Sequence, residues 1–414
     1  MAKKDEPKKV LGIIDALRSN DKEGYFNNSD SGIAYKTGFP QLDYYLGYRK
    51  NIYDENDNII ESYPILGVPS GSILTFIGKP STGKTTIADQ IAGNIVRPFK
   101  NGFILKFDLE QSSNMSRIHN LTRLSMSDIA AGKYLLRKDK YTINDINATI
   151  LRIYNEKISN PDKYLYNTHQ LDEFGKEIII FEPTVIIIDS IASLSSGIDD
   201  KINIAKLEEV GSQADTLRAT GEIGRFFKGI MPYLNASNII LITINHIKDK
   251  PQLGFIPEPS EILYLGQNEH LPGGRAPQFY ASVLLKFIAI GSEKYNFEDD
   301  GFDGYGLKTM IIKSRGNQAG RFVNLVYDKN KGVDALRSTI MYAKELGLTG
   351  GNKNKFYFND NKDEAFSLKN VHDEFRERKE LYKIMFDSVT PHLTRKLSML
   401  SKEDLEVSEE EMMY

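Results

Sequence analysis

The sequence predicts an α/β fold built on a mainly parallel, twisted sheet. Short apolar runs recur along the chain, and they are continuous rather than alternating, which is typical of strands buried on both faces of a parallel sheet. The four clearest runs are residues 73–77, 103–108, 185–189 and 239–245. A segment with helical periodicity, 85–95, follows the first run, so the elements begin in a βαβ rhythm.

The composition limits the class of protein. The chain has 414 residues, of which 40% are hydrophobic, and this excludes wholesale disorder. It has no cysteine, so disulfides, thiolate metal sites and cysteine nucleophiles are excluded. No stretch approaches a membrane span and the N-terminus lacks the apolar region of a signal peptide, so we expect a cytoplasmic protein with no membrane partner.

The flanking segments differ in character from the predicted core. We expect an N-terminal arm and linker over 1–35, with apolar residues at helical spacing, for docking onto another subunit. The core is expected over 36–350, with a helical insertion around 125–182. A small helical C-terminal appendage over 351–400 precedes a disordered acidic tail, 401–414.

Three further β segments are expected in the second half of the core. They are residues 283–290, 307–312 and 322–327.

A phosphate-binding loop lies between the first apolar run and the first predicted helix. It reads Gly78-Lys79-Pro80-Ser81-Thr82-Gly83-Lys84-Thr85, followed by Thr86. Its glycines allow backbone N–H groups to surround a phosphate, and the helix N-terminus adds partial positive charge. Lys84 would reach the β- and γ-phosphates and the Thr85 hydroxyl would bind Mg²⁺. The sequence therefore predicts a site for ATP or GTP with Mg²⁺, the alternative being a glycine-rich turn that matches by chance.

Two acidic positions follow predicted strands. Asp189 ends the run 185–188, where a carboxylate can stand beside the metal, or alternatively cap the strand. Glu110 comes just after the second strand, where it could orient the water that attacks the γ-phosphate. Asp108 is the rival for that role, and a surface acid is the alternative for Glu110.

The order of these motifs resembles the RecA-type recombinase core, a P-loop NTPase fold, in a form similar to the UvsX-type recombinases of tailed bacteriophages. The acid after the second strand, Ile-Ile-Ile-Asp-Ser at 186–190 and Ile-Thr-Ile-Asn-His at 242–246 appear in the family's order. Residues 271–282, with Gly-Gly and Tyr-Ala-Ser, resemble the segment after the family's second DNA-binding loop. Residues 311–315 and 334–348 resemble its next strand and closing helix, so the resemblance covers about 36–350.

The resemblance implies roles for further residues around ATP. His246 takes the position of a γ-phosphate sensor, and Lys313 and Arg315 take those of basic residues that reach the neighbouring subunit's ATP. Arg117 and Tyr327 take the positions of adenine neighbours. For His246 the alternative is a polar residue at a strand end, and for Lys313 and Arg315 it is a solvated strand face. For Arg117 it is a surface arginine, and for Tyr327 a core tyrosine.

The family's two DNA-binding loops would lie at about 196–220 and 248–275. The DNA contacts implied are Lys248, Lys250, Phe255, Gly273, Gly274 and Arg275, with Tyr264 as a second candidate for insertion between bases. Neither loop is basic, so contact would depend on backbone N–H groups and selected cations, and ordinary surface loops are the alternative.

The implied function is an ATP-dependent DNA strand-exchange recombinase, a DNA-dependent ATPase of a bacteriophage. It would form a helical filament on single-stranded DNA, pair it with homologous duplex DNA, and serve recombination, repair and recombination-dependent replication in the bacterial host cytoplasm. Mediator and single-strand-binding proteins are further expected partners. The alternatives are a hexameric replicative DNA helicase on the same core, or an ATP-switched filament scaffold with little turnover.

The net charge of the whole chain hides a difference between the C-terminal segment and the rest. With 53 Lys and Arg against 56 Asp and Glu, the whole chain carries −3, which disfavours an ordinary basic nucleic-acid module. Six acidic residues and one lysine lie in 401–414, so that segment carries −5 and residues 1–400 carry +2. The segment could compete with DNA for basic surface, or serve only solubility.

Overall fold

The computed structural model describes most of the chain. The described residues are 32–54, 56, 58–172, 175–194, 213–249, 265–266, 269–290, 303–352 and 355–397, with only the backbone described for 213–219 and 249. Of the sequence predictions, the arm over 1–31, most of the first predicted DNA loop, Lys250, Phe255, Tyr264 and the acidic tail lie outside these residues.

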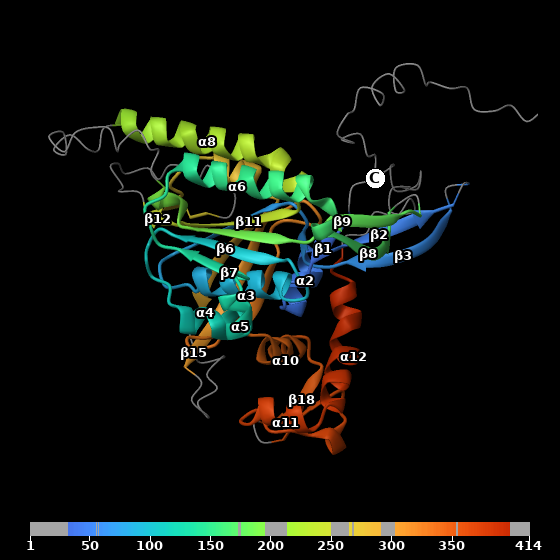
Figure 1. Cartoon of the computed structure of the whole chain (residues 1–414). Helices are drawn as coiled ribbons and strands as arrows, with labels where there is room; N and C mark the ends of the chain where they lie inside the picture. The colour runs from blue at the N-terminus through green and yellow to red at the C-terminus, as the bar shows by residue number, and fades with distance from the viewer. Residues whose placement is uncertain are drawn as a thin grey trace, which may run out of the picture.

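A nine-stranded sheet forms the centre of the molecule (Figure 1). Its order is β17 (Gly332–Asp334), β16 (Phe322–Asp328), β15 (Gly304–Ser314), β14 (Val283–Ile290), β5 (Ile73–Gly78), β11 (Ile239–His246), β10 (Thr184–Asp189), β6 (Phe103–Asp108) and β7 (Tyr134–Arg137). The six strands from β14 to β7 are parallel, and β15, β16 and β17 are antiparallel. The predicted mainly parallel α/β sheet is therefore confirmed.

Helices cover both faces of this sheet. Helices α3 (Lys84–Val96), α4 (Met115–Thr122) and α5 (Met126–Ala130) lie on one face, and α6 (Ile143–Ser159) and α8 (Gln213–Ala236) on the other (Figure 1). β5, β10 and β11 are almost wholly buried because both faces are covered, which explains their continuous apolar sequences. Their carboxyl ends meet at one edge of the sheet, and this edge receives the phosphate loop.

The interval 125–182 is not the purely helical decoration that the sequence predicts. Besides α5, α6 and α7 (Pro161–Tyr164), it contains β7, which joins the central sheet beside β6. It also contains a hairpin of β8 (Leu165–Leu171) and β9 (Glu177–Phe181). β7 has only four residues, and two of them are exposed, so its pattern is too short to predict an edge strand.

A second hairpin stands beside β8 and β9 (Figure 1). It consists of β2 (Tyr48–Tyr53) and β3 (Ile59–Ile65), and it follows α2 (Pro40–Leu46). The Tyr63 hydroxyl donates to the Leu171 carbonyl at 2.6 Å, which links the two hairpins. The short strands β1 (Ala34–Tyr35) and β4 (Val68–Pro69) pair with each other near the base of this hairpin.

The C-terminal part is helical with a hairpin that the sequence does not predict. Helix α10 (Ala335–Glu345) is followed by β18 (Thr349–Asn352), β19 (Lys355–Phe358), α11 (Val371–Glu377) and α12 (Glu380–Thr394). β18 pairs with β19 across the predicted boundary at residue 350. A buried apolar cluster joins α10 to α11, α12 and the hairpin, so these elements share one core.

In the described part of the chain, no helix combines the length and apolar character needed to cross a membrane.

Candidate functional site

The phosphate loop leads from β5 into α3, and its backbone carbonyls accept hydrogen bonds from its own Lys84. Lys84 Nζ donates to the Gly78 carbonyl at 3.1 Å and to the Lys79 carbonyl at 2.8 Å. Burial lowers the pKa of Lys84 to about 8, although Asp189 and Glu110 oppose this shift. The lysine is therefore held inside the loop by two backbone carbonyls.

The backbone at Gly83 has a conformation and a close neighbour that require glycine. Gly83 has φ +78, and a Cβ there would lie 2.6 Å from the Tyr327 ring. Tyr327 pairs across β15 and β16 with Tyr305, whose hydroxyl donates to the Ser81 carbonyl at 3.0 Å. Tyr305 carries no signal in the sequence, because only the strand register places it beside the loop.

Thr85 and Asp189 form the predicted metal pair. The Thr85 hydroxyl donates to Asp189 Oδ2 at 2.7 Å, and the other carboxylate oxygen of Asp189 is buried with no hydrogen-bond partner among the described residues. Burial raises the pKa of Asp189, and Lys106 and the Thr85 hydrogen bond oppose this. An unused buried carboxylate oxygen beside a hydroxyl suits Mg²⁺.

The described residues contain no cluster of three or more His, Cys, Asp or Glu side chains that could hold a metal alone. Mg²⁺ commonly takes one or two carboxylates together with substrate phosphates. The residues present therefore fit a metal ion that arrives with a nucleotide, held by Thr85 and by Asp189.

Glu110 and His246 lie together at the same sheet edge. His246 Nε2 is 3.0 Å from Glu110 Oε1, although the residues are 136 positions apart in the chain. Asp108, the rival of Glu110, is fully buried, and its oxygens accept from the backbone N–H groups of Ser112 and Ser113 at 3.2 and 2.8 Å. Of the two acids, Glu110 is the one that keeps a partly exposed carboxylate.

Arg117 and Tyr327 converge on Thr86, directly after the phosphate loop. Arg117 Nη2 donates to the Thr86 hydroxyl at 3.0 Å, and the Tyr327 hydroxyl donates to the same oxygen at 3.2 Å. A cavity of about 220 Å³ opens here. It is lined by Thr85, Thr86, Asp89, Ser112, Ser113, Asn114, Arg117 and Ile118.

Lys313 and Arg315 are not brought to the phosphate loop of their own chain. Gly78 pairs with Phe287, which pairs with Thr309 on β15. Lys313 lies four residues beyond Thr309, so it is displaced from the level of Gly78 by about 13 Å along the strand, at the usual rise per residue. Lys313 Nζ donates to the Gln278 and Phe279 carbonyls at 3.1 and 2.6 Å. Burial and the neighbouring Arg315 lower the pKa of Lys313.

The described part of the second predicted DNA loop contains a glycine turn beside α8. Gly273 and Gly274 have φ +84 and +71, and a Cβ on Gly274 would lie 2.3 Å from Thr220. Arg275 is exposed at the start of α9 (Ala276–Tyr280). Asn245, next to His246, donates to the Pro272 carbonyl at 2.7 Å, so the end of β11 is joined directly to this turn.

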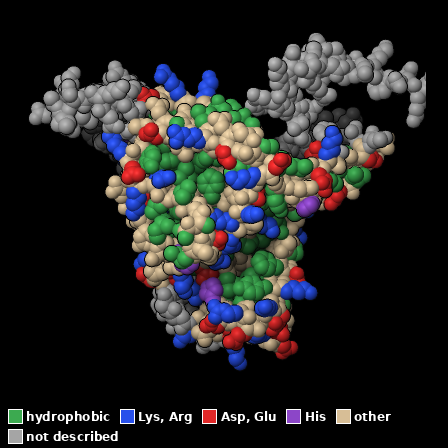
Figure 2. Space-filling view, viewed as in Figure 1, with side chains coloured by type: hydrophobic (Ala, Val, Ile, Leu, Met, Phe, Trp, Pro, Cys, Tyr) green, Lys and Arg blue, Asp and Glu red, His purple; other side chains and the backbone are tan. Residues whose placement is uncertain are grey.

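The other described DNA candidate, Lys248, begins β12 (Lys248–Asp249), which pairs with β13 (Glu269–His270). On the face drawn in Figure 2, the Lys and Arg side chains are interspersed with Asp and Glu.

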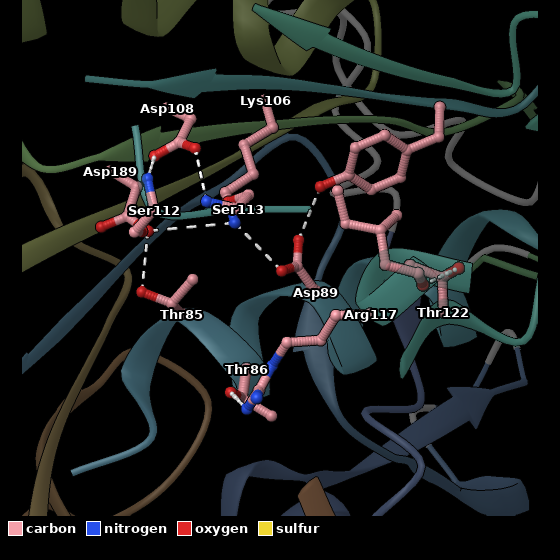
Figure 3. A network of polar contacts seen from close by, with 12 residues as sticks. Thr85, Thr86, Asp89, Lys106, Asp108, Ser112, Ser113, Arg117, Thr122 and Asp189 are labelled. Atoms are coloured by element: carbon pink, nitrogen blue, oxygen red, sulfur yellow. Dashed lines mark hydrogen bonds and ion pairs between the residues drawn. The ribbon is translucent and has the colours of Figure 1, made fainter. Parts of the chain in front are cut away.

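A buried charged group beneath the loop was also missed (Figure 3). Lys106 is fully buried, with its Nζ 3.0 Å from Asp89 Oδ2 and 3.9 Å from Asp189 Oδ2. The Tyr134 hydroxyl donates to the other oxygen of Asp89 at 2.7 Å. The only signal in the sequence was a lysine flanked by apolar residues within a strand.

The comparisons with known proteins agree with this geometry. No family model matches the chain. The protein RecA of Mycoplasma mobile is 25% identical over 345 residues, covering 82% of this chain and 85% of that protein. The RecA of Ureaplasma parvum serovar 3 is 24% identical over 349 residues, covering 80% and 86%, and that of Aquifex aeolicus 26% over 286 residues, covering 68% and 66%. Together with the sheet and the phosphate loop, these similarities support a RecA-type recombinase built on a RecA-like P-loop NTPase core.

Proposed function

We propose that this protein is an ATP-dependent DNA strand-exchange recombinase. The observation that carries the proposal is the meeting of Lys84, Thr85, Asp189, Glu110 and His246 at one sheet edge, in a chain similar to RecA proteins over about four fifths of its length. The activity is a DNA-dependent ATPase coupled to pairing of a single strand with homologous duplex.

ATP would bind across the loop, with its phosphates on Lys84 and the loop N–H groups. Thr85 and Asp189 would hold Mg²⁺, which would supply positive charge next to the phosphates. Arg117 lines the cavity and Tyr327 bonds the Thr86 hydroxyl at its edge, and both are our candidates for the adenine, for which a guanidinium plane is suited.

Glu110 would orient the attacking water, and His246 would report the γ-phosphate. Their 3.0 Å contact supports a coupled role, because a γ-phosphate that engages His246 competes for the same ring nitrogen. The Asn245 bond to Pro272 then connects the strand end to the turn at Gly273 and Gly274, which we propose as part of the DNA surface with Lys248, Lys250, Phe255 and Arg275.

Lys313 and Arg315 would act on the ATP of a neighbouring subunit in a helical filament on single-stranded DNA. Their separation from the phosphate loop of their own chain supports this arrangement. Cations that arrive from a second subunit would stabilise charge on the transferring phosphate and make hydrolysis depend on assembly.

The finer assignment is to the UvsX-type recombinases of tailed bacteriophages, acting in recombination, repair and recombination-dependent replication in the host cytoplasm. It is supported by the residue at position 246, where the phage branch carries His.

The test measures ATPase with and without single-stranded DNA, together with strand exchange on homologous duplex. We expect stimulation by DNA and ATP-dependent joint molecules. No stimulation together with no joint molecules overturns the proposal, and unwinding of duplex without homology would indicate a helicase. Negative-stain images with a nonhydrolysable ATP analogue distinguish a filament from a ring.

A further inference from the structure

Three buried charges lie directly beneath the metal pair. Lys106 on β6 lies between Asp89 on α3 and Asp189 at the end of β10 (Figure 3). Their side chains are 0%, 3% and 1% exposed, so water does not screen them. Charges in such an environment interact far more strongly than on a surface.

Lys106 is closer to Asp89 than to the metal carboxylate. The distances are 3.0 Å to Asp89 Oδ2 and 3.9 Å to Asp189 Oδ2. Asp89 is fixed on its other side, because its Oδ1 accepts from the Tyr134 hydroxyl on β7. Asp89 therefore holds the ammonium group closer to its own carboxylate than to Asp189 Oδ2, the oxygen that accepts from Thr85.

Lys106 and Asp89 make opposite electrostatic contributions to metal binding at Asp189. Lys106 carries the same sign as a divalent cation beside Asp189 and repels it, whereas Asp89 attracts the cation and also restrains Lys106. The three side chains together carry one net negative charge, which is the charge that Asp189 would carry alone.

We propose that Lys106 and Asp89 are positioning residues that set the affinity of the nucleotide site for Mg²⁺. Lys106 weakens metal binding, so that Asp189 takes Mg²⁺ only together with the nucleotide phosphates, and Asp89 limits this weakening by holding Lys106 back. The inference rests on the proposed nucleotide site.

The experiment measures the affinity for a fluorescent, nonhydrolysable ATP analogue in excess Mg²⁺ and in EDTA. The ratio of the two dissociation constants gives the contribution of the metal without any turnover. Four variants of the full chain are compared with the wild type: Lys106→Met, Asp89→Asn, the double variant, and Lys157→Met.

Lys157→Met is the matched control because Lys157 is also a buried lysine but lies outside the nucleotide site. Its Nζ donates to the Glu182 and Ser237 carbonyls at 2.7 and 2.8 Å, near the amino end of β10 rather than near Asp189. Its loss should leave the metal contribution unchanged, whatever it does to stability.

The expected shifts follow the charge that is removed. Lys106→Met should raise the metal contribution about tenfold or more, and Asp89→Asn should lower it about tenfold or more. The double variant restores the net charge and should lie within about threefold of the wild type. A structural role alone would move both single variants in the same direction.

The outcomes that would overturn the inference can be stated in advance. Equal shifts in one direction, or no shifts, overturn the inference. If Lys106→Met does not fold, the comparison of Asp89→Asn with the double variant still decides, because only the double variant should recover. A wild type that binds the analogue equally with and without Mg²⁺ would count against the proposed nucleotide site itself.

Discussion

Lys84 shows at the scale of one residue how the loop Gly78–Thr85 holds a buried charge. Its ammonium group is buried and bonded to two carbonyls of the loop. A buried ammonium without such partners would be costly, so the carbonyls hold it in place. If the proposed nucleotide binds here, its phosphate oxygens would replace these carbonyls at a charge that is already in position.

Replacing Lys84 with alanine should weaken nucleotide binding roughly 100-fold or more, since charged hydrogen bonds to phosphate contribute about 1.5–3 kcal/mol each. Equilibrium titration with a fluorescent ATP analogue measures this loss. Lys100→Ala, at an exposed position outside the loop, is the control and should bind as the wild type does. ATP-dependent filament formation by Lys84→Ala at the wild-type level would contradict the proposed role of the loop.

Asp43 makes stability depend on pH far from the site. The carboxyl is buried in α2 and accepts from the Thr37 N–H at 2.6 Å and the Thr37 hydroxyl at 2.7 Å. Burial raises its pKa from 3.8 to about 7, although these hydrogen bonds oppose the shift. Between these two values the folded state keeps a proton that the unfolded state has lost, so stability falls as pH rises.

Asp43→Asn should remove that dependence. The free energy of unfolding of the wild type, relative to the variant, should decrease between pH 5 and 7 by up to about 1.4 kcal/mol per pH unit. Urea titrations at several pH values measure it. A constant difference between the two proteins over this range would show that Asp43 does not titrate there.

At the scale of elements, the buried strands could be predicted because their apolar runs are continuous. β5, β6, β10 and β11 lie within a residue of their predicted bounds, and the polar residues at their ends meet at the predicted edge. β7 and the three hairpins could not be predicted, because their strands are short or mostly exposed. Tyr305 and the Lys106 group depend on register and on contacts between distant segments.

The cluster that joins α10 to α12 predicts that the C-terminal elements unfold with the core. Leu381→Ala should lower the free energy of unfolding by about 2–5 kcal/mol, because Leu381 is fully buried in this cluster. Lys383→Ala, exposed on the same helix, should change it by less than about 0.5 kcal/mol. Hydrogen exchange monitors α12 and β5 separately, and early exchange confined to α12 would contradict a shared transition.

At the scale of the whole molecule, the strand register separates two sets of charged residues. Glu110 and Lys84 lie at the carboxyl edge of the parallel strands, while Lys313 and Arg315 lie toward the opposite edge. A chain that stacks head to tail would bring these two edges together, so a complete site would need two subunits.

Mixing variants tests this arrangement. Glu110→Gln and the double variant Lys313→Ala/Arg315→Ala should each be inactive alone, but a mixed filament contains interfaces where an intact Glu110 meets intact cations. Random mixing in equal amounts makes roughly a quarter of interfaces complete, so DNA-dependent ATPase should recover to at most about a quarter of wild type. Glu110→Gln mixed with Lys84→Ala is the matched control, because both defects lie on the same side of the interface and no pairing repairs them. Equal rescue in both mixtures, or rescue in neither, would contradict a site shared between subunits.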